Sequence, residues 1–309
     1  MEKERNGTVA FVGLGMMGTP MAENVLRKFS VVAYDIARDK VDGMVKLGAL
    51  AASSPAEAAA GAGIQICVVE TTAQAESVIL GAGGFIDTAQ PGDLVICMAT
   101  IDWLAVKRIH AVLAEKGIDF VDAPVAGMRD NGGAKAASLK CFIGGDVAAV
   151  ERAKPVLSTM CSEIVHFGAV GCGTAIKLLN SMVLQANRIV VAEAFAAGVK
   201  AGLDPERMFD LFSRSYANSS ALQYDAPRYL TRNFDGIRMG ITIKDVDLQL
   251  AFGNALGMPM PMVTQGRQVY QMAKAMGFEF EDAAAIVKVY ERWTGVEVRG
   301  TSQQISKQS

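Results

Sequence analysis

A glycine-rich hexapeptide between a β-rich run and a helical run constrains the fold of this chain more than any other segment. Residues 13–18 are Gly-Leu-Gly-Met-Met-Gly, after the apolar run 8–12 and before a helical pattern over 20–28. In such a unit Gly13 permits the turn, Gly15 lets a ligand approach the backbone, and Gly18 allows close helix packing. The helix N-terminus then attracts phosphates. We predict a pyrophosphate site formed by Gly13, Leu14, Gly15, Met16, Met17 and Gly18.

An acidic residue ends the second β-rich run. Asp35 lies 22 residues after Gly13, where a carboxylate can accept hydrogen bonds from the hydroxyls of an adenosine ribose. A carboxylate at this point repels a 2′-phosphate, which favours NAD as the cofactor. Arg38, three residues on, could pair with that phosphate and leaves NADP possible.

Short β-rich runs alternate with helical patterns up to residue 168. The β-rich runs cover 8–12, 31–35, 65–69, 94–98, 119–122, 140–143 and 163–166, and the helical patterns cover 20–28, 40–47, 55–60, 74–80, 103–116 and 147–160. This alternation is typical of βαβ units in a mostly parallel sheet with helices on both faces. We predict an α/β fold whose N-terminal domain, residues 1–168, is a doubly wound Rossmann domain.

The pattern changes after Gly168, where strand-sized runs stop. Helical periodicities cover 174–201, 205–215, 243–256, 262–276 and 282–293. The first of these has apolar residues on more than one side, as expected for a helix that packs against two domains. We predict a C-terminal all-α domain over residues 169–309, joined by a long interdomain helix over about 174–201 and ending in a disordered polar tail, 301–309.

Size and charge exclude several classes of protein. A chain of 309 residues is too long for one hydrophobic core, so two domains are expected. A net charge of −2 without a basic block argues against nucleic acid or anionic lipid as a partner. The apolar runs are shorter than the roughly 20 residues that span a bilayer. Residues 1–7 are rich in charged side chains and lack the apolar stretch of a secretory signal. We expect a cytoplasmic protein without a membrane segment.

Cysteine and histidine usage gives no metal site. The five cysteines form no CxxC pair, and the chain has only two histidines. We expect reduced, mostly buried thiols and no bound metal.

Four blocks of sequence together resemble the β-hydroxyacid dehydrogenase family, the family of 3-hydroxyisobutyrate dehydrogenase. They are residues 13–24 (GLGMMGTPMAEN), 122–128 (DAPVAGM), 171–181 (GCGTAIKLLNS) and 243–248 (IKDVDL). The resemblance extends from Val9 to about Tyr290. It implies hydride transfer between NAD(P) and a small 3-hydroxy acid or the corresponding semialdehyde.

The third block contains the residue that the resemblance implies to be catalytic. Lys177 matches the family lysine that exchanges a proton with the substrate oxygen. Partial burial beside an oxidised nicotinamide would favour its neutral form, as general acid–base catalysis requires. Asn180 matches an asparagine that positions the substrate, and Ser181 replaces a second one.

The second block is similar to a loop that binds the substrate carboxylate, DAPVSGG in the family. Here Ala126, Gly127 and Met128 occupy the positions that would contact the acid, so a serine and a glycine of the family motif are missing. Backbone N–H groups can still bind an anion. Arg129 is a candidate to compensate, and the identity of the acid stays open.

The resemblance implies two further cofactor contacts. Lys244 in the fourth block would contact the nicotinamide half of the cofactor, with Asp245 orienting it or capping a helix. Thr100 would lie next to the nicotinamide ribose, although Ala99 and Trp103 depart from the usual serine and proline nearby.

The leading hypothesis is therefore an NAD(P)-dependent 3-hydroxyacid dehydrogenase that uses Lys177 as general acid and base. The alternatives are a dinucleotide-binding interaction protein without turnover and an imine reductase, and the presence of Lys177 argues against both. The resemblance also implies a homodimer or homotetramer.

Overall fold

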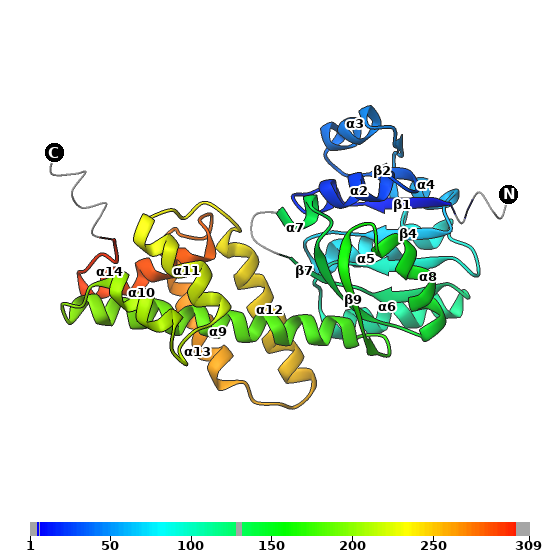
Figure 1. The fold of residues 1–309 in the computed structure, drawn as a ribbon. Coiled ribbons are helices and arrows are strands. Elements are labelled where there is room, and N and C mark those ends of the chain that lie inside the picture. Colours follow the sequence, from blue (N-terminus) through cyan, green and yellow to red (C-terminus); the bar gives the residue numbers. More distant parts are fainter. Residues whose placement is uncertain (1–4, 6, 128–131, 301–309) are drawn as a thin grey trace. The chain divides into compact units, whose positions relative to one another are not determined.

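The computed structural model describes residue 5 and residues 7–127 and 132–300. The chain divides into two compact units, Met1–Leu178 and Leu179–Ser309. Helix α9 (Cys172–Lys200) begins in the first unit and ends in the second (Figure 1).

The first unit is built on a sheet that, over the described residues, has nine strands in the order β3-β2-β1-β4-β5-β6-β8-β7, with β9 paired to β8. Strands β1 to β6 are parallel, β8 runs antiparallel to β6 and β7, and β9 runs parallel to β8. The strands are β1 (Thr8–Val12), β2 (Ser30–Tyr34), β3 (Leu50–Ala51), β4 (Ile64–Cys67), β5 (Leu94–Cys97), β6 (Asp119–Asp122), β7 (Val125–Ala126), β8 (Leu139–Gly144) and β9 (Cys161–Gly168).

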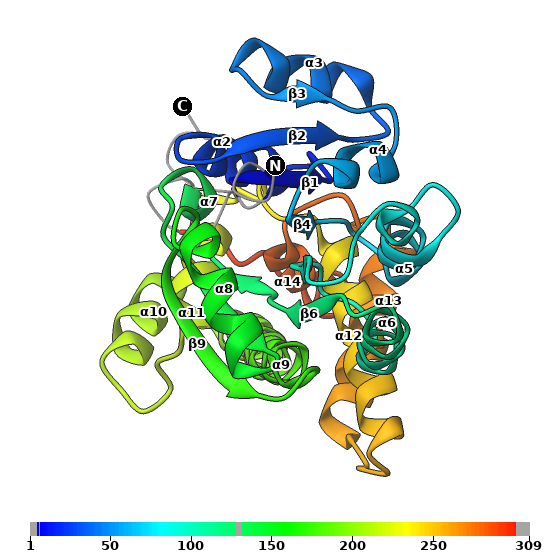
Figure 2. The same ribbon diagram turned by 90° about the vertical axis from the view of Figure 1, so that its right-hand side faces the viewer.

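Helices cover both faces of this sheet, because alternate residues of the central strands face opposite cores. Val9 and Phe11 of β1 pack in one core with residues of α2, α3, α7 and α8, whereas Ala10 and Val12 pack in another with residues of α4, α5 and α6. Figure 2 shows α2, α7 and α8 on one side of the strands and α4, α5 and α6 on the other. The helices are α2 (Gly18–Leu26), α3 (Arg38–Lys46), α4 (Pro55–Ala60), α5 (Thr72–Leu80), η1 (Phe85–Asp87), α6 (Trp103–Glu115), α7 (Gly132–Lys135) and α8 (Val147–Leu157). The predicted doubly wound α/β fold is confirmed.

The second unit, over its described residues, consists of helices and loops with one isolated β-bridge between Arg238 and Asp282. After α9 come α10 (Pro205–Ser213), α11 (Ser220–Thr231), α12 (Met239–Ala255), α13 (Pro261–Ala275), η2 (Ala283–Ile286) and α14 (Val287–Thr294). The sequence pattern did not predict α11, which carries an internal proline and buries the charged Asp225 among its apolar residues. The predicted tail, 301–309, lies outside the described residues.

Helix α9 is two residues longer at its start than the predicted range 174–201 and ends at Lys200. Among the described helices, α9 alone is long and apolar enough to cross a bilayer, judged by length and composition only. The core helix of a water-soluble protein also meets these two criteria. Arg188 on this helix is buried and donates from Nε to Asp225 Oδ2 at 2.9 Å. Its charge is therefore paired inside the helical unit.

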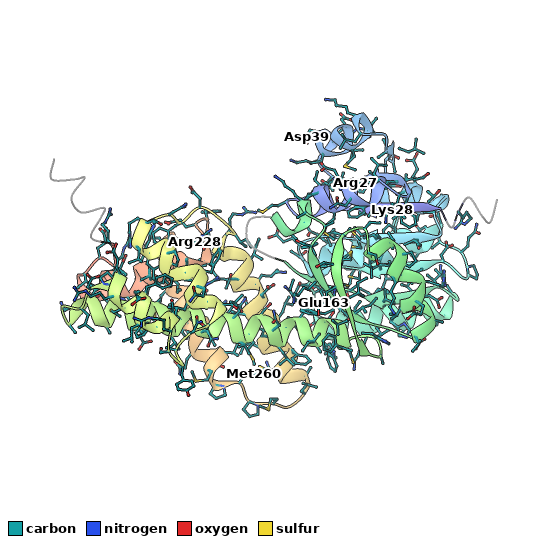
Figure 3. All side chains as sticks on the ribbon, viewed as in Figure 1. Arg27, Lys28, Asp39, Glu163, Arg228 and Met260 are labelled. Atoms are coloured by element: carbon teal, nitrogen blue, oxygen red, sulfur yellow. The ribbon has the colours of Figure 1, made fainter. Side chains whose placement is uncertain are left out.

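A buried carboxylate organises the helical unit. Asp282, 1% exposed, accepts hydrogen bonds from Tyr224 Oη at 2.8 Å, from the Ile237 N–H at 3.0 Å and from the Ala284 N–H at 2.8 Å. Arg228 lies on α11 (Figure 3). Its Nε is 3.6 Å from Asp282 Oδ1. These contacts join α11, the segment before α12 and the start of η2.

Replacing Asp282 with alanine is expected to lower the free energy of unfolding by about 3–5 kcal/mol, because it leaves three hydrogen-bond donors and the half-buried Arg228 guanidinium without their acceptor. The exposed Asp235→Ala is the control and should change it by less than about 0.5 kcal/mol. Urea denaturation followed by circular dichroism measures both. Equal effects of the two substitutions would contradict the assigned role of Asp282.

Candidate active site

The three motif glycines differ in what surrounds them. Gly13 has φ +101°, and a Cβ there would lie 2.0 Å from the Val68 carbonyl oxygen. A Cβ on Gly18 would lie 1.9 Å from the Gly13 carbonyl oxygen, whereas a Cβ on Gly15 would have no atom within 4 Å. Gly13 and Gly18 are therefore required by the fold itself. Gly15 is not, and its open backbone is what a ligand needs for close approach.

The glycine loop lies at the point where the strand order reverses. Strands β2 and β3 follow β1 on one side, and β4, β5 and β6 follow on the other. The carboxyl ends of parallel strands at such a point form the ligand-binding edge of doubly wound sheets. Helix α2 begins here at Gly18. Its N-cap residue, Met17, makes no side-chain hydrogen bond to the helix, and the first turn, which the structure describes in full, contains no acidic residue. The positive end of its dipole is therefore available to a phosphate.

Asp35 follows β2 directly, since the strand ends at Tyr34, one residue earlier than predicted. Its Oδ2 accepts the Leu14 N–H at 2.6 Å and its Oδ1 accepts the Ala37 N–H at 2.8 Å. The carboxylate thus also holds the glycine loop. Arg38 is exposed and pairs with Asp42 one helical turn on, at 3.1 Å. Such exposed pairs contribute at most about 1 kcal/mol, so Arg38 stays available to an anion.

Asp122 fixes the start of α9. It is the last residue of β6 and is fully buried, with Oδ1 accepting the Gly171 N–H at 2.7 Å and Oδ2 accepting the Thr174 N–H at 2.6 Å. These are two of the N–H groups that the first turn of a helix cannot bond internally. A carboxylate from a neighbouring strand therefore caps α9 at the carboxyl edge of the sheet.

Close backbone packing locks the same junction. A Cβ on Gly173 would lie 2.5 Å from the carbonyl oxygens of Asp122 and Phe142, and one on Gly144 would lie 2.6 Å from Asp122 Oδ1. The first turn of α9 thus lies directly on the backbones of β6 and β8. Lys177, half-buried, follows in the second turn.

Helical spacing places Asn180 and Ser181 on the same side of α9 as Lys177, since they follow it by three and four residues. Asn180 is exposed, whereas Ser181 is 6% exposed. Of this predicted set, Asn180 is the more accessible to a ligand.

The other predicted positions are distributed over three elements. Ala126 lies in β7, paired with Lys140 of β8, and Gly127 is exposed just beyond it. Met128, predicted to contact the substrate, and Arg129 lie outside the described residues. Thr100 is half-buried after β5, in the loop before α6.

The role of Asp245 as a helix cap is wrong. Helix α12 begins at Met239, so Asp245 lies in its second turn, where it pairs with Lys244 Nζ at 3.1 Å. The alternative prediction, that Asp245 orients Lys244, agrees with this geometry.

Sequence reasoning missed the structural part of the site. Asp122 belongs to the second motif, which predicts no role for it, and Trp103 differs from the proline usual in the family without a predicted role. Trp103 Nε1 donates to the Gly171 carbonyl oxygen at 3.1 Å, next to the N–H that Asp122 accepts. Only the folded chain brings these residues together, because Trp103 and Gly171 are 68 positions apart.

Burial raises the pKa of Asp122 from 3.8 to about 6, although the N–H groups of Gly171 and Thr174 act in the opposite direction. Because the folded-state pKa lies above the unfolded one, the folded state binds the proton more tightly. The contribution of Asp122 to stability is therefore complete below about pH 4 and is lost as the pH rises through 6.

Comparison with Asp122→Asn, which does not titrate, tests this. The stability of the wild type relative to Asp122→Asn should fall by about 3 kcal/mol between pH 4 and pH 7, at about 1.4 kcal/mol per pKa unit. Urea denaturation of both proteins at each pH measures the difference. A difference that stays constant or grows with pH would contradict the raised pKa.

Two family models match the chain. Residues 8–168 match a family model described as the NAD binding domain of 6-phosphogluconate dehydrogenase, and residues 171–290 match one described as NAD-binding of NADP-dependent 3-hydroxyisobutyrate dehydrogenase.

Relatives align with the chain over nearly its whole length. A 2-(hydroxymethyl)glutarate dehydrogenase of Eubacterium barkeri is 34% identical over 96% of this chain and 99% of its own, and an NAD-dependent L-serine dehydrogenase of Pseudomonas aeruginosa is 31% identical over 93% and 99%. The structure of a Mycobacterium tuberculosis 3-hydroxyisobutyrate dehydrogenase with L-serine superposes with a TM-score of 0.81 at 29% identity, covering 91% of this chain and 98% of that one. The chain therefore belongs to the β-hydroxyacid dehydrogenase family and is an NAD(P)-dependent hydroxyacid dehydrogenase.

Proposed function

We propose that this chain transfers a hydride between NAD and a small 3-hydroxy acid or its semialdehyde, with Lys177 as the general acid and base. One observation carries the proposal. The Asp122 carboxylate caps α9 at the carboxyl end of β6, the sheet edge at which the glycine loop follows β1. The helix that bears Lys177 thus starts at the edge where the dinucleotide loop lies.

The residues at this edge fit the cofactor. The open backbone at Gly15 and the uncapped start of α2 would hold the pyrophosphate, and Asp35 would accept hydrogen bonds from the ribose hydroxyls. Asp35 favours NAD, and Arg38 leaves NADP possible. When bound, the nicotinamide accepts or donates the hydride.

The protein would contribute proton transfer and substrate orientation. In the oxidative direction Lys177 takes the proton of the substrate hydroxyl, and in the reductive direction it returns that proton to the oxygen. Asn180, one turn further along α9, would orient the same hydroxyl. The backbone at Ala126 and Gly127 would bind the carboxylate, in the absence of the serine found in the family motif.

The names of the relatives support an acid with its hydroxyl on the carbon β to the carboxylate. Both 2-(hydroxymethyl)glutarate and L-serine have this arrangement, as does 3-hydroxyisobutyrate. A carboxylate anchor and a proton acceptor near the β-oxygen are what such a substrate requires.

Substitution of Lys177 tests the mechanism. Oxidation of a panel of 3-hydroxy acids, followed by NADH absorbance, should occur with the wild type and fall by a factor of about 10²–10⁴ in kcat for Lys177→Ala. Added ethylamine should restore part of the lost rate, since it supplies a proton acceptor in the space that the side chain leaves. The matched control is Lys200→Ala, at the far end of α9, which should keep the wild-type kcat.

Two outcomes would contradict the proposal. A wild type that binds NAD but turns over no acid, semialdehyde or imine would indicate a binding protein. A wild type that reduces cyclic imines and no semialdehyde would indicate an imine reductase.

Glycine substitutions test the cofactor site. Gly15→Ala should fold with wild-type stability but bind NAD at least about tenfold more weakly, because the added methyl occupies the open approach to the backbone. Gly18→Ala should be destabilised, since its Cβ would meet the Gly13 carbonyl oxygen. The control is Gly43→Ala, exposed within α3 with no atom near its Cβ, which should bind NAD as the wild type does and unfold at no lower temperature. Titration calorimetry and thermal unfolding give the two readouts, and unchanged NAD binding by Gly15→Ala would contradict the assignment.

The proposal extends to assembly and location. We expect a cytoplasmic homodimer or homotetramer, and two apolar side chains seven residues apart on α9, Val183 and Val190, are each 57% exposed and available to a second copy. Sedimentation equilibrium measures the assembly, and a monomer at micromolar concentration would contradict it.

A further inference from the structure

The backbone of Gly171, directly before α9, is held on both sides of its Cα, at its N–H and at its carbonyl oxygen. Its N–H donates to Asp122 Oδ1 at 2.7 Å, and its carbonyl oxygen accepts from Trp103 Nε1 at 3.1 Å and from the Ala175 N–H at 2.9 Å. Gly171 has φ +94°, and a Cβ there would lie 3.0 Å from Trp103 Nε1. The indole thus lies against a bare backbone and fixes the orientation of the first peptide of the helix.

Trp103 is itself held in place. It is the first residue of α6, whose N-cap, Asp102, accepts the Ala105 N–H at 2.8 Å and donates its own N–H to Thr72 at 3.0 Å. Lys107, one turn further along α6, places Nζ 3.6 Å from the centre of the indole ring. A cation over the ring face at this distance restrains the plane of the ring.

These contacts join two segments that the proposed function uses. The loop before α6 contains Thr100, predicted to lie next to the nicotinamide ribose, and α9 carries Lys177. The bond from Trp103 to the Gly171 carbonyl connects them directly.

We infer that Trp103 is a positioning residue for Lys177, acting through the Gly171 carbonyl and the first turn of α9. The inference rests on the proposed function. Lys177 lies six residues after Gly171, so a tilt of the first turn displaces the lysine relative to the loop at Thr100. Displacements of about 1 Å at a reacting group can reduce a rate by about a hundredfold.

The bond has a small effect on overall stability. A single neutral hydrogen bond contributes only a small part of the free energy of unfolding of a domain, and a half-buried indole can be partly rehydrated when the bond is lost. Its loss should therefore loosen the first turn of α9 without unfolding the unit. A positioning role thus predicts local loosening of α9 in a folded protein, whereas a merely structural role predicts a loss of overall stability.

The test removes the donor and keeps the ring. Trp103→Phe retains an aromatic face for Lys107 and has no N–H. Benzothienylalanine at position 103 retains the full bicyclic shape with sulfur in place of the N–H, and it serves if Trp103→Phe fails to fold. Leu104→Ala is the matched control, an exposed neighbour in the same turn of α6.

Three quantities are measured for each protein: amide hydrogen exchange of residues 172–178 without cofactor, the dissociation constant for NAD, and kcat and KM for the best hydroxy acid of the panel. Both donor-free variants should show exchange in 172–178 about fivefold faster, in line with the loss of about 1 kcal/mol. Their kcat should fall about tenfold, while KM and NAD binding stay within twofold. Leu104→Ala should match the wild type in all three.

The outcomes separate this inference from the proposed function. Unchanged exchange or unchanged kcat in both donor-free variants overturns the positioning role of Trp103. A proportional loss of NAD binding also overturns it, because it would place the effect at the cofactor loop. Failure of the wild type to oxidise any hydroxy acid overturns the proposed function instead, and the exchange measurement, which needs no substrate, still decides whether Trp103 restrains α9.

Discussion

The structure of the site depends on one buried carboxylate. Asp122 accepts two N–H groups from the start of α9 while it is fully removed from water. Burial disfavours its charge, whereas the N–H groups and the positive end of the helix dipole favour it. Because the same residue ends β6, the edge of the sheet sets the position of the first turn of α9. The location of Lys177 follows from this contact.

The glycines around Asp122 make that contact possible. A Cβ on Gly144 would clash with the Asp122 carboxylate, and a Cβ on Gly173 would clash with the Asp122 carbonyl oxygen. Sheet and helix therefore approach one another at backbone distance. The same principle applies at the dinucleotide loop, where Gly13 and Gly18 allow close packing and Gly15 leaves space for the ligand.

The general fold could be predicted from the sequence because its signals are local. Strands buried on both faces appear as short apolar runs, such as β4 and β5, and glycines mark the turn after β1. The elements that were missed have weak local signals. β3 and β7 have two residues each, η1 has three and α7 has four, and α11 contains a proline and buries the charged Asp225. Such elements are specified by tertiary contacts that no short window contains.

In the candidate site, too, some features have local sequence signals and others depend on tertiary contacts. The roles of Gly13, Gly15 and Gly18 follow from spacing, but the hydrogen bonds of Asp122 and Trp103 to Gly171 join positions 49 and 68 residues apart. No local pattern predicts them.

A crystal structure of the protein with NAD and a 3-hydroxy acid tests the central claim most directly. Lys177 Nζ should lie about 3 Å from the substrate hydroxyl oxygen, with the Asp122 bonds to Gly171 and Thr174 intact. A hydroxyl group more than about 5 Å from Lys177 and bonded to another side chain, in a complex that turns over in solution, would contradict it.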